Sequence, residues 1–399
     1  MQTEESTLPI RESGKTRGRV NGAGTPNARL FSFFSGAGFL DLGFEAVGFE
    51  IVLVNEIYRP FLVSYTKSRE RMGLPKPLYG YEACDVRDLL VGAKRTALGK
   101  KVRDAKRDGH LVGFIGGPPC PDFSIAGHNK GGDGDNGRLS ASYMELVCQQ
   151  KPSFFVFENV KGLWQTKRHR EFYCDLRQQA WDAGYVTDER MINALEYGVP
   201  QDRDRVILVG FQEGLVPQHM RRDKGHLFDH TAFPWRDYVS YNLDVTKNLP
   251  WPTQTPFGAN SVLPAPPGVP IELTVQHWFS ANAVSIHPNA NDVFLPRQGL
   301  ARFISIPEGD TSRKSYKRLH RWRYSPTACY GHNEVHLHPY EPRRISVAEA
   351  LALQSLPASY VLPAELSLTD KFKTVGNGVP YLAARGIALT IQEMIRRLT

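Results

Sequence analysis

One cysteine of this chain lies in a setting that suits a nucleophile. Cys120 belongs to the run Gly-Gly-Pro-Pro-Cys-Pro at residues 116–121, which directly follows an apolar segment at 111–115. Glycines and prolines in this order predict a rigid, non-helical turn, and open α/β sheets bind ligands where their strands end. A buried structural thiol needs no such backbone, so we interpret Cys120 as a positioned nucleophile. The remaining cysteines lack this setting and are expected to be structural: Cys84, Cys148, Cys174 and Cys329.

Charged side chains mark the ends of two further apolar segments. Glu158 comes directly after four apolar residues, a position typical of a functional carboxylate but also of a helix-capping or loop-pairing acid. Arg203 and Arg205 alternate with acids and lead into the next strand, so their guanidinium groups are expected on one side of it. Two such groups suit a phosphate or a base carbonyl, although paired surface charge is the alternative interpretation.

A glycine-containing turn opens the first predicted helix. The run Phe-Ser-Gly-Ala-Gly at residues 34–38 follows an apolar strand and leaves helix N-terminal amides near a ligand. The dinucleotide fingerprint G-x-G-x-x-G requires a third glycine where Asp41 stands, which argues against a nicotinamide dehydrogenase. Glu56, twenty residues after the first glycine, suits ribose hydroxyls, and Asp85 suits an adenine amino group. A plain strand-turn-helix with solvated acids is the alternative.

The wider pattern predicts the elements that position these residues. The 399 residues are 41% hydrophobic and 23% charged, which is typical of a globular protein with room for two domains. Apolar segments alternate with helix-length segments and predict an α/β fold with a doubly wound, mostly parallel sheet. Residues 249–270 hold seven prolines, which excludes regular helix there. We therefore predict a flexible tail at 1–28, a first domain at 29–212, an irregular second domain at 213–342 and a C-terminal return to the first domain at 343–399.

Composition limits the partners. A net charge of +8 permits a polyanion, and five cysteines without a C-x-x-C pair exclude a disulfide framework and a zinc ribbon. No apolar run suggests a membrane span or a signal peptide, so a cytoplasmic protein is expected. The stretch 311–324 carries six basic residues, no acid and three aromatic residues, which indicates either contact with DNA phosphates or a solvated face. Its basic residues are Arg313, Lys314, Lys317, Arg318, Arg321 and Arg323.

Taken together, these motifs resemble the DNA (cytosine carbon-5) methyltransferase family. The run at 34–38, Asn55-Glu56, Asp85, Pro-Pro-Cys at 118–120, Glu158-Asn159-Val160, Gln-x-Arg-x-Arg at 201–205 and Gly-Asn-Gly-Val at 376–379 follow the order of that family. The resemblance implies a Rossmann-like methyltransferase fold, with residues 213–342 as a smaller target-recognition domain. Four positions depart from the common pattern. Phe39 replaces a glycine, Ser32 replaces an acidic residue, Gly378 stands where serine is common, and Ala352 stands where arginine is frequent.

The resemblance also implies a reaction. Cys120 would add as a thiolate to carbon-6 of cytosine, Glu158 would hold ring nitrogen 3 and the exocyclic amine, and Arg203 and Arg205 would act around the base carbonyl and the cysteine turn. A base inside a duplex is out of reach, so the cytosine must be flipped out. The methyl donor would be S-adenosyl-L-methionine, leaving S-adenosyl-L-homocysteine, and no metal is expected. The residues implied to bind this donor are Phe34, Gly36, Ala37, Gly38, Glu56, Asp85, Val86, Pro119, Leu139, Asn377 and Val379.

The sequence is therefore interpreted as a sequence-specific methyltransferase of double-stranded DNA. It would be the modification enzyme of a restriction-modification system, with a cognate restriction endonuclease acting at the same site. It is expected to be a monomer of the bacterial cytoplasm or nucleoid that does not bind membranes. Two alternatives are a tRNA cytosine-5 methyltransferase on the same scaffold and a catalytically silent DNA-binding relative. The length of the 213–342 region favours DNA, and the joint presence of Cys120, Glu158, Arg203 and Arg205 favours an active enzyme.

Overall fold

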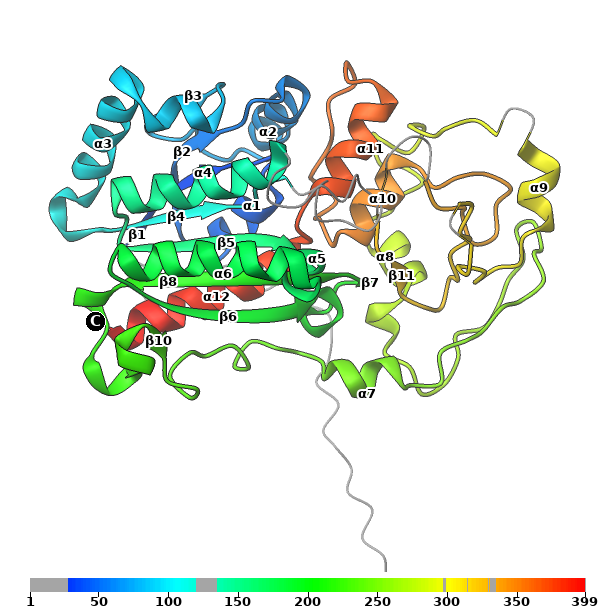
Figure 1. The fold of residues 1–399 in the computed structure, drawn as a ribbon. Coiled ribbons are helices and arrows are strands. Elements are labelled where there is room, and N and C mark those ends of the chain that lie inside the picture. The colour runs from blue at the N-terminus through cyan, green and yellow to red at the C-terminus, as the bar shows by residue number, and fades with distance from the viewer. Residues whose placement is uncertain are drawn as a thin grey trace, which may run out of the picture.

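A computed structural model describes residues 28–119, 135–296, 299–313, 315–328, 330 and 335–398 of the chain. Within these residues, a nine-stranded sheet has the strand order β3-β2-β1-β4-β5-β8-β6-β10-β9 (Figure 1). The strands of this sheet are β1 (Ala28–Phe33), β2 (Glu50–Asn55), β3 (Tyr81–Glu82), β4 (Leu111–Gly116), β5 (Phe154–Val160), β6 (Tyr185–Asn193), β8 (Asp204–Gln212), β9 (Arg221–Arg222) and β10 (Leu227–Phe228).

The predicted α/β fold with a mostly parallel sheet is confirmed. Strands β1 to β5 pair in parallel, whereas β8 runs antiparallel to both of its neighbours, β5 and β6. The sequence pattern does not predict strand β6, because its centre, Thr-Asp-Glu-Arg, interrupts the apolar run. Its ends are buried while its middle is only partly covered, as in a strand near the edge of a sheet.

Helices cover both faces of the sheet (Figure 1). Neighbouring residues of one strand point to opposite faces, so Leu30 packs into one core cluster and Phe31 into the other. The first cluster contains residues of α1 and α12, and the second contains residues of α3, α4 and α6. The helices of the chain are α1 (Phe39–Glu45), α2 (Arg59–Arg71), α3 (Gly92–Lys106), α4 (Asp135–Gln150), α5 (Lys161–Gln165), α6 (Lys167–Asp182), α7 (Leu243–Lys247), α8 (Val275–Ala281), α9 (Leu300–Ser305), α10 (Val347–Leu353), α11 (Leu368–Asn377) and α12 (Tyr381–Leu398).

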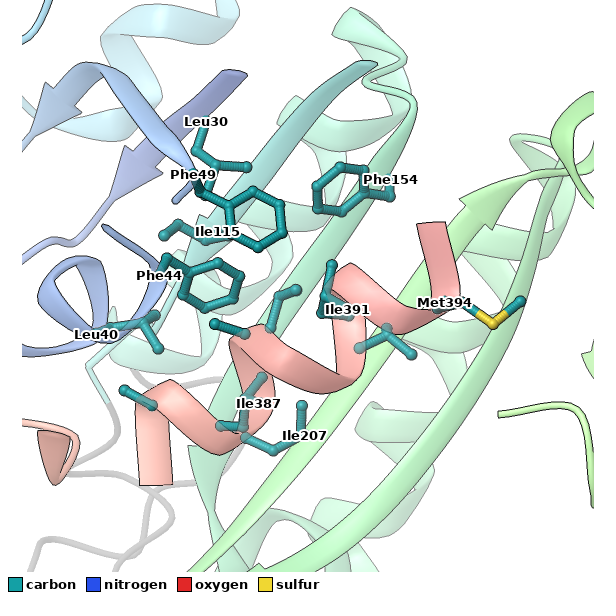
Figure 2. Packing of buried hydrophobic residues seen from close by; sticks show 14 of the residues in the cluster. Leu30, Leu40, Phe44, Phe49, Ile115, Phe154, Ile207, Ile387, Ile391 and Met394 are labelled. Atoms are coloured by element: carbon teal, nitrogen blue, oxygen red, sulfur yellow. The ribbon is translucent and has the colours of Figure 1, made fainter. Parts of the chain in front are cut away.

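The last helix lies in the same core as the first strand. Figure 2 shows Ile387 and Ile391 of α12 beside Phe44 of α1, near Leu30 of β1 and Ile115 of β4. All five side chains are buried. The segments at the two ends of the described chain thus form one hydrophobic layer.

An irregular region adjoins the carboxyl ends of the strands (Figure 1). It contains α7, α8 and α9 and a short strand, β11 (Ser325–Pro326), which pairs with β7 (Gln201–Asp202) next to the sheet. A third core cluster joins this region to the sheet layer, since Phe279 of α8 and Leu351 of α10 share it with Phe39 of α1. Among the helices that the structure describes, none is both long and apolar enough to span a membrane.

Candidate active site

The carboxylate of Glu158 forms the centre of the site. Glu158 is 8% exposed near the end of β5, and its Oε1 lies 2.7 Å from Nε of Arg205. Strand pairing explains this contact, because Arg205 of β8 lies opposite Val160, two residues beyond Glu158 on the same face of β5. A guanidinium group so close fixes the orientation of the carboxylate.

The turn that leads to Cys120 lies directly against this carboxylate. A Cβ atom added at Gly117 would lie only 2.7 Å from Oε2 of Glu158, so no larger residue fits without displacing the acid. Cys120 itself lies outside the described residues. Gly117 nevertheless fixes the start of the cysteine turn next to Glu158, which explains why a glycine is needed there.

Arg203 fastens three segments together. It is 2% exposed, and it donates to the carbonyl oxygens of Ala328, at 3.0 Å, and Gly376, at 2.9 Å. Ala328 belongs to the irregular region and Gly376 to α11, so one side chain joins both to the end of β7. Arg205 pairs with Glu158 instead, so the two arginines have different partners.

Glu56 organises the glycine turn. Its Oε2 accepts a hydrogen bond from the Gly36 amide at 2.9 Å, and its Oε1 accepts one from the Tyr58 amide at 2.7 Å. Burial raises the pKa of Glu56, and these backbone donors act in the opposite direction. Gly36 has a φ of +56°, and the space where a side chain would stand is open. The carboxylate and an open glycine backbone therefore border one cradle beside the end of β2.

The segment before Asp85 is held next to this cradle. The Asn55 amide donates to the carbonyl oxygens of Glu82 and Cys84, both at 2.9 Å. The carboxylate of Asp85 accepts from the backbone and the guanidinium group of Arg87, at 2.9 Å and 2.6 Å, which lowers the pKa of Asp85. Arg87 thus holds the ionised carboxylate of Asp85, which follows the segment that Asn55 fixes.

The other residues implied to bind the methyl donor come from several elements. Phe34 is partly buried with a φ of +52°, and its ring centroid lies 6.5 Å from that of Tyr143. Val86 and Val379 are buried, Leu139 is partly buried, and Pro119 and Asn377 are exposed. An open glycine turn, a carboxylate beside it and flanking apolar surface suit a ligand with a sugar and an aromatic base. In the described residues, no three metal-ligating side chains come together.

Two of the departures from the family pattern, Phe39 and Gly378, explain each other. A Cβ atom at Gly378 would lie 2.0 Å from the ring of Phe39, which is far closer than any contact permits. The ring also packs edge-on against Tyr360, with centroids 5.2 Å apart. An aromatic residue at 39 therefore occupies the space in which a side chain at 378 would lie, and glycine at 378 follows from it.

Sequence reasoning missed a buried support below the glycine turn. Asp41 is fully buried and accepts from the hydroxyls of Ser32 and Tyr65, both at 2.8 Å. Burial raises the pKa of Asp41 to about 6. The sequence indicates Asp41 only as a missing glycine, and Ser32 follows no pattern that pairs it with an acid nine residues away. These bonds join β1 and α1 on either side of the turn.

Two of the basic residues predicted to contact DNA do not face solvent. Arg318 is fully buried and donates to the carbonyl oxygens of Ile306, at 2.9 Å, Phe303 and His338. Arg321 is 4% exposed, and its Nη2 lies 2.8 Å from Oε2 of Glu308. The expectation that these two arginines contact DNA is corrected here, because their donors are used inside the irregular region.

The remaining predicted DNA contacts lie nearer the surface. Arg313 is 49% exposed and pairs with Asp310 at 3.3 Å, whereas Lys317 and Arg323 are partly exposed. Lys314 lies outside the described residues. The basic stretch thus contributes less positive surface than its composition indicates.

Comparison with known proteins identifies the family of this chain. Residues 28–393 match the model of the C-5 cytosine-specific DNA methylase family. The chain therefore belongs to that family and is a cytosine carbon-5 DNA methyltransferase. It is 56% identical to the Type II methyltransferase M.NmeDI of Neisseria meningitidis serogroup C, over 92% of this chain and 84% of that protein.

More distant relatives also match nearly the whole chain. The Type II methyltransferase M.FnuDI of Fusobacterium nucleatum is 29% identical, over 92% of this chain and 95% of that protein. The crystal structure of the Dnmt2 methyltransferase of S. pombe superposes with a TM-score of 0.56 at 10% identity, covering 93% of this chain and 99% of that one. The structural match shows that the fold is shared at very low sequence identity.

Proposed function

We propose that this protein is the sequence-specific modification methyltransferase of a Type II restriction-modification system. The observation that carries this proposal is the contact of Glu158 with Arg205 and with the backbone of the cysteine turn, in a chain 56% identical to a Type II methyltransferase. The substrate would be a cytosine flipped out of double-stranded DNA. A cognate restriction endonuclease would cut the same site when it is unmodified, and the methyltransferase would act as a monomer in the bacterial cytoplasm.

The reaction needs a nucleophile because carbon-5 of cytosine reacts poorly by itself. The Cys120 thiolate would add to carbon-6, and the electron pair of the 5,6 double bond would then make carbon-5 nucleophilic. The carboxyl group of Glu158 would accept a hydrogen bond from the exocyclic amine and share a proton with ring nitrogen 3, so that the negative charge that develops in the ring as the thiolate adds is neutralised. Carbon-5 would then take the methyl group as its bond to the donor sulfur breaks, and loss of the carbon-5 proton to a base would restore the 5,6 double bond as the thiolate leaves.

The arginines would act by positioning. Arg205 lies 2.7 Å from Glu158, so it would keep the acid correctly oriented. Arg203 would fix the relative placement of the sheet, the irregular region and α11 through its bonds to Ala328 and Gly376. Rigid support of this kind matters because a catalytic group displaced by about 1 Å loses much of its effect.

S-adenosyl-L-methionine would supply the electrophilic methyl group. Glu56 and the open backbone at Gly36 would bind its ribose and methionine ends, while Phe34, Asp85 and Val86 would surround its adenine. The support for this placement is the cradle between the ends of β1 and β2, where the Glu56 carboxylate faces the glycine turn. The other contacts proposed for this ligand come from Ala37, Gly38, Pro119, Leu139, Asn377 and Val379.

The proposal is tested by expressing the protein in a host without cytosine methylation and sequencing its DNA after bisulfite treatment. We expect a single cytosine within one short recognition sequence to be protected from conversion. DNA from cells with the empty vector should show no protected cytosine. The protected DNA should also resist an endonuclease specific for that recognition sequence. Complete conversion of every cytosine, with the protein present and folded, would contradict the proposal, and protection of tRNA alone would support the tRNA alternative.

Replacing Glu56 by glutamine is expected to weaken binding of S-adenosyl-L-methionine about tenfold, because charged acceptors contribute about 1.5–3 kcal/mol per bond. Glutamine offers one acceptor oxygen, whereas the Gly36 and Tyr58 amides use both oxygens of the acid. Isothermal titration of the purified protein measures the change. Glu50→Gln is the matched control, since Glu50 begins the same strand but pairs with Arg29 at the surface. Equal affinity of both variants and the wild type would remove Glu56 from the binding site.

A further inference from the structure

Two arginines flank one tyrosine in the irregular region. The guanidinium carbon of Arg302 lies 4.6 Å from the ring centroid of Tyr316, and that of Arg344 lies 5.7 Å from the same centroid. Tyr316 has a φ of +61°, a left-handed conformation that is costly for an aromatic residue. Such strain persists only where the surrounding contacts hold it, and it concentrates at functional sites.

Among the described residues, no acid pairs with the cations of this group. Within the described parts of the chain, Arg302, Lys317 and Arg344 form no ion pair with a carboxylate, unlike nearby Arg313 and Arg343, which pair with Asp310 and Glu349. Burial lowers the pKa of Arg344, which shows that its charge is partly removed from water. Arg302 is exposed, and Tyr316, Lys317 and Arg344 are partly exposed. Cations brought together around one ring without an acid repel each other, so an external anion would stabilise the arrangement.

The group rests on a rigid base. Buried Arg318 donates to the carbonyl oxygens of Phe303 and Ile306 at the end of α9, and to those of His338 and Glu341. These bonds hold α9 against the neighbouring segments of the irregular region, where Phe303, Ile306 and Leu337 form a small core with Tyr316 at its edge. Buried Arg318 therefore holds in place the segments that carry Arg302 and Tyr316.

We propose that Arg302, Tyr316, Lys317 and Arg344 bind the phosphate backbone of the DNA substrate. Phosphate oxygens suit this site because guanidinium groups present planar pairs of donors and the tyrosine hydroxyl adds another. The site lies around α9, on the outer side of the irregular region (Figure 1). This inference rests on the proposed action on DNA and assigns to these residues the role that the basic composition of 311–324 predicts for Arg318 and Arg321.

The test is the double variant Arg302→Gln/Arg344→Gln of the full chain. Binding is measured by fluorescence anisotropy over a series of salt concentrations. One duplex contains the recognition sequence of the enzyme, and a second duplex lacks it. We expect about tenfold weaker binding to both duplexes. The plot of log K against log salt should be shallower by about 1 for each phosphate that the variant no longer neutralises. The kcat for methylation at saturating DNA should stay unchanged, since no catalytic group is touched.

The matched control is Arg236→Gln, which removes an equally exposed arginine from the segment after β10. This control should bind both duplexes as the wild type does. Lys317→Gln gives a second, milder test, and thermal melting of each variant checks that it is folded. The inference would be overturned if the folded double variant bound DNA with the affinity and salt dependence of the wild type. It would also be overturned if binding weakened only for the duplex that contains the recognition sequence. If the wild type itself neither binds nor methylates DNA, it is the proposed function that fails.

Discussion

Replacing Cys120 by serine is expected to abolish methyl transfer, lowering kcat by about 10³-fold or more, as loss of the nucleophile does in other covalent enzymes. A serine hydroxyl is not ionised near neutral pH and adds poorly to carbon-6 of cytosine. DNA binding should be retained, because the change removes no positive charge and no large side chain. Transfer of labelled methyl groups to duplex DNA measures the first effect, and anisotropy measures the second.

Cys174→Ser serves as the control for this variant, because Cys174 is an exposed cysteine on α6. It should methylate as the wild type does. A second readout uses a duplex with fluorine at carbon-5 of the target cytosine. Release of the thiolate requires a proton to leave carbon-5, so the wild type should remain covalently attached to this duplex and the Cys120→Ser variant should not. Full methylation by the variant would exclude the covalent route through Cys120.

Replacing Glu158 by glutamine is expected to lower kcat by about 10²–10³-fold, the effect of removing one preorganised electrostatic group. Glutamine keeps the size of the side chain but removes the charge that Arg205 orients at 2.7 Å. An uncompensated arginine then remains beside the base, so the two changes reinforce each other. Single-turnover kinetics with preformed enzyme–DNA complex measure the chemical step apart from binding.

The control for Glu158 is Glu213→Gln, because Glu213 also pairs with an arginine, Arg221, but is 60% exposed at the surface. This variant should keep its wild-type rate. A Glu158→Gln protein that is folded and methylates at the wild-type rate would show that the carboxylate plays no part in the reaction.

Much of the fold is predictable from local pattern. The buried strands are nearly continuous apolar runs, as expected for strands covered on both faces, and β4 follows the apolar segment at 111–115 closely. Strand β6 shows no such run, because its polar centre is only half covered. The antiparallel direction of β8 depends on how the chain returns across the sheet, which periodicity does not encode.

Some residues of the site can likewise be predicted from local pattern, and others cannot. Motifs point to Glu56, Glu158 and Arg205, because each follows or enters an apolar strand. No local signal distinguishes Arg318, which caps carbonyl oxygens inside the protein, from Arg344, which lies beside a partly exposed ring. Which cation lies inside depends on where backbone carbonyls gather after folding. The steric dependence of Gly378 on Phe39 cannot be predicted from local sequence either, because the two residues are distant in sequence and meet only in the folded protein.

The placement of α12 bears on how the protein is made. Because Ile387 and Ile391 fill the layer that covers Phe44 and Leu30, this face of the sheet stays open until α12 has left the ribosome. A nascent chain that lacks this helix exposes apolar surface and is prone to aggregate. Termination before or within α12 should therefore give insoluble protein, so methylation would come only from chains that contain this helix.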